Sequence, residues 1–400
     1  MRGIQVLFSM LICGAFAATH AAADLPGVIW QADHGGSVAT VDFSTSGRLV
    51  ASGASNGNES ARVWRAADGQ PVAEFPDQLS GVVWVSISPD DRYLAVGAIH
   101  PDFYQPQIRT NVYEIATQQL VRTYLGVRNA WSADGRVIAT AGGAFNRDVD
   151  VDDFITGTQL ASIYTGGYIG GMALAPDASF VVTGSFSDGS VSIWDVASGA
   201  LIRRLYGHAA GISALALSPD GQLIASGTAD PNVQAEIKLW RVADGQLLHT
   251  LEGHRTRLLG LAFSPDGRKL LSCGQEAYTG GPYNVRLWRV ATGERLDTFQ
   301  YDGNAFGLSA IDYAGDGSAI VLGQGSGYVT VALPPRGIVG DLNCDGVINF
   351  DDIGPFVLAL SGRGAYAAAY VACDWLNADI DGDGTVAFND INPFVALLGA

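Results

Sequence analysis

The chain has 400 residues, of which 48% are hydrophobic and 16% charged, and its formal net charge is −17 at pH 7. This length and apolar content allow a large folded core and more than one domain. The acid excess excludes nucleic acid as an expected partner, because phosphate recognition needs clustered Lys and Arg.

The amino terminus has the pattern of a secretory signal peptide. Arg2 is followed by an almost wholly apolar run from Ile4 to Ala18 and then by the small residues Ala21–Ala23. The apolar run is too short to span a bilayer, so we expect a signal peptide over residues 1–23 that is cleaved near Ala23. The sequence therefore predicts a secreted, extracellular or cell-surface protein with no membrane span.

Internal repeats fill the middle of the chain. Two plain copies occupy residues 206–299, and each begins with Gly-His and ends near Trp-Arg. Short runs of alternating apolar and polar residues, separated by Pro-Asp-Gly and Asp-Gly turns, predict four antiparallel strands per unit. The turn between the first two strands recurs seven times and predicts seven units, at residues 44–47, 88–91, 132–135, 175–178, 218–221, 264–267 and 314–317.

These repeats resemble the WD-repeat family. The resemblance implies an all-β, seven-bladed WD-type β-propeller over residues 24–335. The segment Gly27–His34 matches the last strand of a unit, so we expect it to pair with the final blade around Tyr328–Ala332 and close the ring. The position of the family's tryptophan reads, blade by blade, Trp64, Tyr113, Asp152, Trp194, Trp240, Trp288 and Ala332.

The family's Gly-His histidine, a strand Ser or Thr, a turn Asp and the Trp form a buried hydrogen-bond chain. The resemblance implies that the histidines are structural, and the matching residues are His208, Ser226, Asp230 and Trp240 in one blade and His254, Ser272 and Trp288 in the next. Asp152 at a Trp position indicates either a distorted blade 3 or a solvent-facing run Asp148–Asp153, which could form a third cation site.

Two aromatic inserts identify a candidate ligand-binding face. One lies in the second blade and one in the sixth, and both fall between the second and third strands, so they should rise on the same face. Exposed aromatic rings suit the binding of peptides or sugars. The alternative is that these rings cover the blade edge. The residues concerned are His100, Phe103, Tyr104, Tyr278 and Tyr283.

Two twelve-residue acidic loops repeat each other near the carboxyl terminus. Asp341–Asp352 and Asp379–Asp390 both place oxygen-bearing residues at loop positions 1, 3, 5 and 12 and glycine at position 6. Calcium needs six to eight oxygens, and the glycine permits the sharp turn that brings them together. Each loop is followed by one expected apolar helix, Ile353–Leu360 or Ile391–Leu398.

This loop–helix pair, with Asp closing each loop, resembles the dockerin type I family. The resemblance implies a small α-helical, EF-hand-like domain over residues 341–400, after a linker at 336–340, that binds two calcium ions and a cohesin-like module. The implied ligands are Asp341, Asn343, Asp345, the Val347 carbonyl, Asn349 and Asp352, and then Asp379, Asp381, Asp383, the Thr385 carbonyl and Asp390. Loop position 10 is Phe350 or Phe388, which departs from the family, and we expect these rings to pack into the domain core.

The cysteines fit an oxidising compartment. Cys344 and Cys373 both lie in the small C-terminal domain, where a disulfide would stabilise a module with little core. Cys273 lies in a strand-like run and is expected to be a buried free thiol.

The sequence identifies no catalytic residue. Ser55 has nucleophile-elbow spacing, but β-like segments flank it on both sides, whereas the elbow joins a strand to a helix. We therefore predict a secreted, non-catalytic interaction protein. The propeller would bind a protein or glycan ligand, and the calcium-dependent module would tether it to an assembly or surface through a protein partner. The alternatives are a polysaccharide-degrading glycoside hydrolase component or a carbohydrate-binding propeller of an extracellular complex, and both are analogies.

Overall fold

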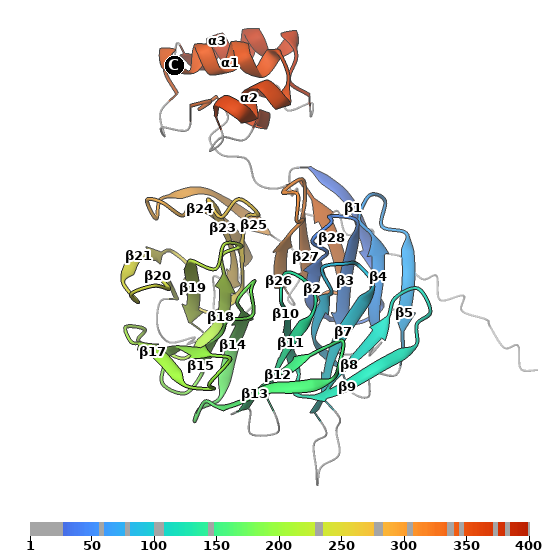
Figure 1. Cartoon of the computed structure of the whole chain (residues 1–400). Helices are drawn as coiled ribbons and strands as arrows, with labels where there is room; N and C mark the ends of the chain where they lie inside the picture. Colours follow the sequence, from blue (N-terminus) through green and yellow to red (C-terminus); the bar gives the residue numbers. More distant parts are fainter. Residues whose placement is uncertain are drawn as a thin grey trace, which may run out of the picture.

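The computed structural model describes residues 27–55, 60–76, 81–99, 108–142, 148–228, 235–275, 283–301, 307–333, 340–343, 348–370, 375–380 and 385–398. Within these residues, 28 strands form seven four-stranded sheets arranged as a ring (Figure 1). The protein is therefore a seven-bladed β-propeller, as the seven recurring turns predict. Short helices follow the ring along the chain.

The blades are numbered in chain order. Blade 1 consists of β2 (Val38–Phe43), β3 (Leu49–Ala54), β4 (Ala61–Arg65) and β5 (Pro71–Phe75). Blade 2 consists of β6 (Val82–Ile87), β7 (Tyr93–Ile99), β8 (Ile108–Glu114) and β9 (Leu120–Leu125). Blade 3 consists of β10 (Arg128–Trp131), β11 (Val137–Ala141), β12 (Asp148–Asp153) and β13 (Thr158–Tyr164). Blade 4 consists of β14 (Ile169–Leu174), β15 (Phe180–Ser185), β16 (Val191–Asp195) and β17 (Leu201–Leu205). Blade 5 consists of β18 (Ile212–Leu217), β19 (Leu223–Thr228), β20 (Glu236–Arg241) and β21 (Leu247–Glu252). Blade 6 consists of β22 (Leu258–Phe263), β23 (Lys269–Gln275), β24 (Tyr283–Arg289) and β25 (Arg295–Tyr301). Blade 7 consists of β26 (Leu308–Tyr313), β27 (Ile320–Gln324), β28 (Tyr328–Ala332) and the first strand of the chain, β1 (Val28–Asp33).

The ring closes by pairing its first strand with its last blade. Strand β1 is antiparallel to β28, and Trp30 lies opposite Val331 in the ladder. This pairing confirms the predicted role of Gly27–His34. It joins the two ends of the propeller chain in one sheet, so closure depends on contacts between residues about 300 positions apart.

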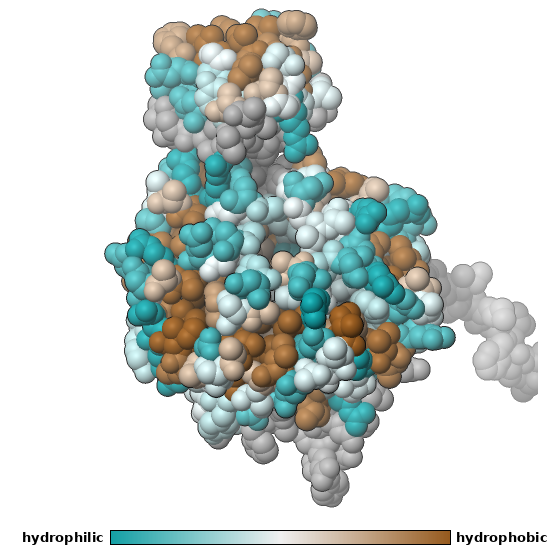
Figure 2. Space-filling view, in the orientation of Figure 1, coloured by the Kyte–Doolittle hydropathy of each residue, from teal (hydrophilic) through white to brown (hydrophobic). Residues whose placement is uncertain are grey.

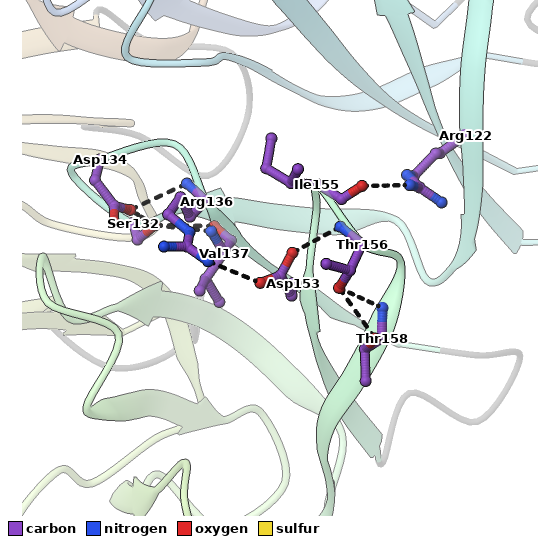
Figure 3. Close-up of polar contacts among 9 residues, drawn as sticks. All are labelled: Arg122, Ser132, Asp134, Arg136, Val137, Asp153, Ile155, Thr156 and Thr158. Atoms are coloured by element: carbon purple, nitrogen blue, oxygen red, sulfur yellow. Dashed lines mark hydrogen bonds and ion pairs between the residues drawn. The ribbon is translucent and has the colours of Figure 1, made fainter.

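The recurring turn is held by a short hydrogen-bond network between its own residues. In blade 3 the Ser132 hydroxyl donates to Asp134 at 2.6 Å, and Asp134 accepts from the backbone N–H of Arg136 at 3.0 Å (Figure 3). Gly135 has φ of 69°, a conformation that glycine adopts without a steric penalty. The same Ser-to-Asp bond is present at Ser88, Ser218 and Ser264, so the turn chemistry sets the strand spacing in several blades.

The tryptophan position is the same register position in every blade. Asp152 lies opposite Ile138 in blade 3, as Trp194 lies opposite Val181 in blade 4. Blade 3 keeps its four-stranded ladder, so the prediction of a distorted blade is wrong. In the run Asp148–Asp153, Asp148 is exposed and Asp150 and Asp153 are half-buried, whereas Asp152 is buried, so the prediction of a solvent-facing run is wrong for Asp152 itself. The aromatic volume comes instead from Phe154, whose ring lies 5.0 Å from that of Trp131 and 4.9 Å from that of Tyr93.

Side chains of one blade reach the inner strand of the next. The first strand of each blade is an edge strand, so the backbone groups on its free side need partners other than a strand. Three hydroxyl side chains supply them across blade boundaries: Val85 N donates to Thr40 Oγ1 at 3.3 Å, Ser309 Oγ donates to Val38 O at 2.6 Å, and Ser213 Oγ donates to Leu258 O at 2.8 Å.

Outer-strand side chains make a second set of bonds between blades. In several blades, the residue at one shared register position of the fourth strand donates a hydrogen bond to the next blade. The acceptor is a backbone carbonyl that follows the third strand of that next blade. Figure 3 shows Arg122 of β9 donating to Ile155 O at 3.0 Å. The other members are Trp30 to Ala66 O at 2.6 Å, Arg203 to Ala243 O at 3.4 Å and His249 to Ala291 O at 3.0 Å.

Two carboxylates occupy matching positions on the inner strands of neighbouring blades. Asp312 accepts from Phe43 N at 2.9 Å, and Asp42 accepts from Ile87 N at 2.7 Å, each across a blade boundary. Burial inside the ring raises the pKa of Asp312 to about 6. Burial and the neighbouring Asp312 also raise the pKa of Asp42. The blade 7–blade 1–blade 2 junction thus contains an acid pair that resists full ionisation.

The helical module comprises the described residues of 340–398, with η1 (Phe350–Asp352), α1 (Ile353–Leu360), α2 (Arg363–Ala369), η2 (Trp375–Ala378), η3 (Phe388–Asp390) and α3 (Ile391–Leu398). The bounds of α1 and α3 match the two predicted helices, whereas α2 was not anticipated. The rings of Phe356 and Phe394 stack with centroids 4.2 Å apart, so the two repeated helices pack on each other. Tyr366 of α2 is fully buried and donates to Leu342 O at 2.7 Å.

We predict that Trp30→Ala weakens ring closure. The variant removes a large buried ring and the hydrogen bond to Ala66, so the free energy of unfolding in urea should fall by about 3–5 kcal/mol. Ile29→Ala is the matched control, because Ile29 lies on the same strand and is 45% exposed. Its effect should stay below about 1 kcal/mol. Equal losses in the two variants would contradict the role of Trp30.

We also predict that the contribution of Asp312 to ring stability falls as pH rises from 5 to 7. The pKa of Asp312 is raised in the folded state, so the folded protein holds that proton more tightly, and the stabilisation is lost as pH passes through about 6. Buried His208, whose pKa is lowered to about 4, contributes in the opposite direction over this interval. The Asp312 contribution is therefore measured as the difference in unfolding free energy between wild type and Asp312→Asn, which should change by about 1–2 kcal/mol between the two pH values.

The control for the pH experiment is Asp177→Asn. Hydrogen bonds from Ser179 lower the pKa of Asp177, so this turn carboxylate is ionised across the whole interval in both folded and unfolded states. Its substitution should leave the slope of unfolding free energy against pH unchanged between pH 5 and 7. An unchanged slope in Asp312→Asn would refute the assignment.

Candidate functional site

The two aromatic inserts fall where the sequence predicts in the strand order. Residues 100–107 connect β7 to β8, and residues 276–282 connect β23 to β24, so both join the second and third strands of their blades. His100, Phe103, Tyr104 and Tyr278 lie outside the described residues, and only the backbone position of Tyr283, at the start of β24, is described. Their role as a ligand-binding face therefore stays a prediction.

The histidines of blades 5 and 6 are structural. His208 Nε2 lies 2.7 Å from Ser226 Oγ and accepts its proton, while Ser226 Oγ accepts from Trp240 Nε1 at 2.8 Å. His208 Nδ1 lies 3.0 Å from the Glu236 carboxylate, which therefore accepts its proton. Burial lowers the pKa of His208 to about 4, so the ring is neutral at pH 7.

The equivalent network in blade 6 joins His254, Ser272 and Trp288, with both bonds at 2.8 Å. These distances confirm the predicted hydrogen-bond chains. Asp230, the predicted fourth member in blade 5, lies outside the described residues. Sequence reasoning missed Glu236, which is placed by its register on β20 and not by a turn motif.

Blade 4 departs from this pattern. Blades 1, 5 and 6 carry a histidine four residues before their first paired inner-strand residue, namely His34, His208 and His254, but blade 4 carries Thr165 there. The tryptophan bond is kept, because Trp194 Nε1 donates to Thr183 Oγ1 at 2.9 Å. The blade thus retains its tryptophan anchor while losing the imidazole ring that would cover it.

Two further large side chains are replaced by serine at the same place. Alignment of Trp194 with Trp240 puts Ser190 and Ser192 at the positions of Glu236 and Lys238 in blade 5. A cavity of about 320 Å³ results. We call it the blade-4 pocket, and its lining includes Tyr164, Thr165, Gly166, Gly167, Tyr168, Ile169, Thr183, Gly184, Ser185, Ser187, Asp188, Ser190, Ser192, Trp194 and Arg204.

The central channel forms a second, larger cavity. Inner strands of all seven blades line its volume of about 600 Å³. Arg128 lies beside the ring of Trp84, with its guanidinium carbon 5.2 Å from the ring centroid, and donates to Ile169 O at 3.3 Å. Burial, and secondarily Arg257, lower the pKa of Arg128 to about 10, so it remains a cation at neutral pH. Arg128 begins the inner strand β10, and Arg257 directly precedes the inner strand β22. Asp42 and Asp312 lie near the ends of the inner strands β2 and β26. The channel therefore carries basic side chains at one end and acidic side chains at the other.

The two acidic C-terminal loops are closed in the same way by their last residue. Asp352 accepts from Leu342 N at 2.6 Å and from Asn349 N at 2.9 Å. Asp390 accepts from Ile380 N at 2.6 Å and from Ala387 N at 2.9 Å. Loop positions 2, 9 and 12 are therefore joined identically in both copies, which draws the two ends of each loop together.

The remaining predicted ligands are only partly described. Asp341, Asp352, Asp379 and Asp390 are buried, and Asn343, Asn349 and Thr385 are described at the loop margins. Asp345, Val347, Asp381 and Asp383 lie outside the described residues, as do Cys344 and Cys373. Without those positions, the described part of the chain contains no cluster of three acid, His or Cys side chains that could hold a metal.

The expectation that Phe350 and Phe388 pack into the module core is wrong. Phe350 is 74% exposed and Phe388 81% exposed. The core is filled instead by Phe356 and Phe394, one turn further into the repeated helices, because their side chains face the partner helix. Cys273, in contrast, is the predicted buried free thiol, and burial raises the pKa of that thiol to about 12.

Comparisons with known proteins agree with this architecture. The family model "WD domain, G-beta repeat" matches residues 29–65, 157–195, 199–234 and 245–288. Three of these matches contain the tryptophan of the shared register position, namely Trp64, Trp194 and Trp288, and the match over residues 199–234 ends before Trp240. Among the described residues, every helix is too short or too polar to cross a membrane.

The curated relatives share part of the propeller. The chain is 27% identical over 166 residues to the B-type cell cycle switch protein ccs52B of Medicago truncatula, covering 39% of this chain and 32% of that protein. It is 28% identical over 163 residues to an uncharacterized WD repeat-containing protein of Synechocystis, covering 38% and 43% of the two chains. The chain thus spans less than half the length of these relatives. From its blades, its register and these matches, the protein is a seven-bladed β-propeller that contains WD40 repeats.

Proposed function

We propose that this is a non-catalytic interaction protein, in which the propeller is a platform for protein ligands and the helical module is a calcium-dependent tether. The closed ring supports the first half, because its blades hold loops on a rigid frame. The relatives include one named as an anaphase-promoting complex subunit, cdh1 of Dictyostelium discoideum, which is consistent with a role in assemblies. His208, which is neutral at pH 7 and bonded through both ring nitrogens, serves structure rather than catalysis.

The repeated closure of the acidic loops carries the calcium part of the proposal. In both copies the position-12 carboxylate binds backbone N–H groups from the two ends of its loop. Residues 340–400 contain nine Asp and a single basic residue, Arg363, which is exposed on α2. Calcium prefers oxygen ligands and would offset this local negative charge, so the donor set fits the ion.

The ligands in the first loop would be Asp341, Asn343, Asp345, the Val347 carbonyl, Asn349 and Asp352. The second loop would use Asp379, Asp381, Asp383, the Thr385 carbonyl and Asp390. Bound calcium would supply a fixed positive charge to each loop and couple ion binding to folding of the module. Secretion, proposed from residues 1–23, would expose these loops to an extracellular calcium supply.

A repeated exposed apolar surface supports the tether. Phe350 and Val357 are exposed on the first loop–helix unit, and Phe388 and Val395 are exposed at the corresponding places of the second. Figure 2 shows hydrophobic residues gathered over the surface of the module. Large exposed rings beside a polar surface mark protein interfaces. We infer a cohesin-like protein partner that can contact either copy of this surface.

Calcium removal tests the tether directly. In the full-length mature protein, chelation with EGTA should abolish the calorimetric transition of the helical module and leave that of the propeller unchanged. Titration of the metal-free protein should give two calcium ions per chain. Calcium at about 100 times its dissociation constant should stabilise the module by about 2.7 kcal/mol for each bound ion.

Substitution of the closing aspartates provides the control. Asp390→Ala should remove one of the two ions and lower the calcium-induced shift in module melting temperature, whereas Asp351→Ala, an exposed neighbour of loop position 12 in the first copy, should keep both ions. A single transition that ignores calcium, or no bound metal, would refute the calcium-dependent tether.

The partner surface can be tested with a recombinant type I cohesin module as the probe. Binding should require calcium. Phe350→Ser and Phe388→Ser alone should each retain binding through the other copy, and the double variant should lose at least tenfold in affinity. No binding of the wild-type protein, or equal binding of the double variant, would contradict this partner class.

A further inference from the structure

The blade-4 pocket has a polar floor. Thr183, Ser190 and Ser192 line it and are all more than nine-tenths buried, while Trp194 closes it from the core side. In blade 5 the corresponding space is occupied by His208, Glu236 and Lys238, which bond to one another and to Ser226. Three large-to-small replacements at one place therefore open a cavity, yet its walls carry hydroxyl groups rather than the apolar side chains of a packing defect.

Two opposite charges face the same cavity. Asp188 Oδ1 accepts from the Ser190 hydroxyl at 2.8 Å and from its N–H at 3.1 Å. Burial acts against ionisation of Asp188, but hydrogen bonds from Ser185 and Ser190 leave its pKa lowered, so it is an anion at neutral pH. Arg204 donates from Nε to Ser192 Oγ at 3.1 Å. Among the described residues this is its one hydrogen bond, which leaves the two terminal nitrogens of its guanidinium for a ligand.

Aromatic rings stand at the entrance. Tyr164, the last residue of β13, is 64% exposed, and Tyr168, in the connection from β13 to β14, is 44% exposed; both line the pocket. Between them Gly166 has no atom within 4 Å of the position that a Cβ would take. In blades 5 and 6, the connection that carries the histidine covers the equivalent side of the blade. In blade 4 this side of the entrance is therefore open.

We propose that the blade-4 pocket binds a neutral sugar unit of an oligosaccharide. Adjacent hydroxyl groups of a sugar can donate hydrogen bonds to Asp188 and accept hydrogen bonds from the Arg204 guanidinium at the same time, because each hydroxyl group is both a donor and an acceptor. The buried serine and threonine hydroxyls extend this pattern. The tyrosine rings provide flat apolar surface for the C–H face of the sugar, with little loss of side-chain freedom. The volume of about 320 Å³ suits one small ligand unit.

The charge pair selects against ionic ligands. A carboxylate or phosphate that reached Arg204 would meet the anionic Asp188, and an ammonium or guanidinium group that reached Asp188 would meet Arg204. Each of these encounters is repulsive because the two charges have the same sign. A neutral polyhydroxyl compound avoids both. This binding activity is separate from the calcium-dependent tether, since every lining residue belongs to blade 4, to the end of β13 or to the connection between them.

Isothermal titration of the full-length mature protein tests the proposal. The probes are cellohexaose, xylohexaose, mannohexaose and maltohexaose, compared with the anionic hexagalacturonate and the cationic glucosamine hexamer. At least one neutral probe should bind, and more tightly than either charged one. Binding should persist in EGTA, which separates this result from that of the tether. Failure of all four neutral probes, or tighter binding of a charged one, would overturn the proposal.

Two variants locate the site, with one matched control. Arg204→Ala should weaken binding at least tenfold, whereas Arg203→Ala, its neighbour on β17, should bind normally because Arg203 points to the Ala243 carbonyl of blade 5. Thr165→His should restore the ring that blades 5 and 6 possess, bond to Thr183 and abolish sugar binding. Its melting temperature should not fall, because the ring fills a cavity. Undiminished binding in Thr165→His or Arg204→Ala would place the sugar elsewhere and refute this assignment.

Discussion

The structure depends on satisfying the free edge of each inner strand. A blade of four strands has two edges, and the inner edges of all seven blades meet around one channel. Buried N–H and C=O groups need partners, so side chains from the preceding blade bond to them through Thr40, Ser213, Ser309, Asp42 and Asp312. A matching set on the outer strands, which includes Trp30 and Arg122, joins each of its blades to the next. These short side-chain bonds strengthen the boundaries between blades 7 and 1, 1 and 2, 2 and 3, 4 and 5, and 5 and 6, in addition to the apolar packing between sheets.

Because backbone register and these inter-blade bonds define a blade, its signature side chains can change without loss of the fold. Blade 3 has Asp152 in place of tryptophan and recovers aromatic volume from Phe154 and Trp131. Blade 7 has Ala332 at that position and gains β1 as its fourth strand. Blade 4 keeps Trp194 bonded to Thr183 but lacks the histidine above it. In that blade the space is left open and lined with polar groups, so a local departure from the repeat creates a pocket on an otherwise intact scaffold.

The helical module follows a different physical rule. Its core is small and is built around the stacked Phe356 and Phe394, while four buried aspartates crowd its loop ends. Backbone N–H groups at both ends of each loop converge on Asp352 or Asp390, which organises the loops but does not offset the charge of the segment. Under the proposed calcium binding, a module with one basic residue and nine acidic ones would gain from a bound cation in proportion to how many of those carboxylates it folds together.

The sequence by itself determined the number of blades, the closing strand and the bounds of α1 and α3, because turn chemistry and apolar periodicity are local signals. The two hydrogen-bonded histidine chains were implied by the resemblance of the repeats to the WD-repeat family. It did not determine the compensation in blade 3, the exposure of Phe350 and Phe388, the role of Glu236 or the blade-4 pocket. Each of these depends on which side chains face one another across strands or blades. Thr165, Ser190, Ser192 and Arg204 are ordinary residues in the chain, and only the register of four strands brings them around a common cavity.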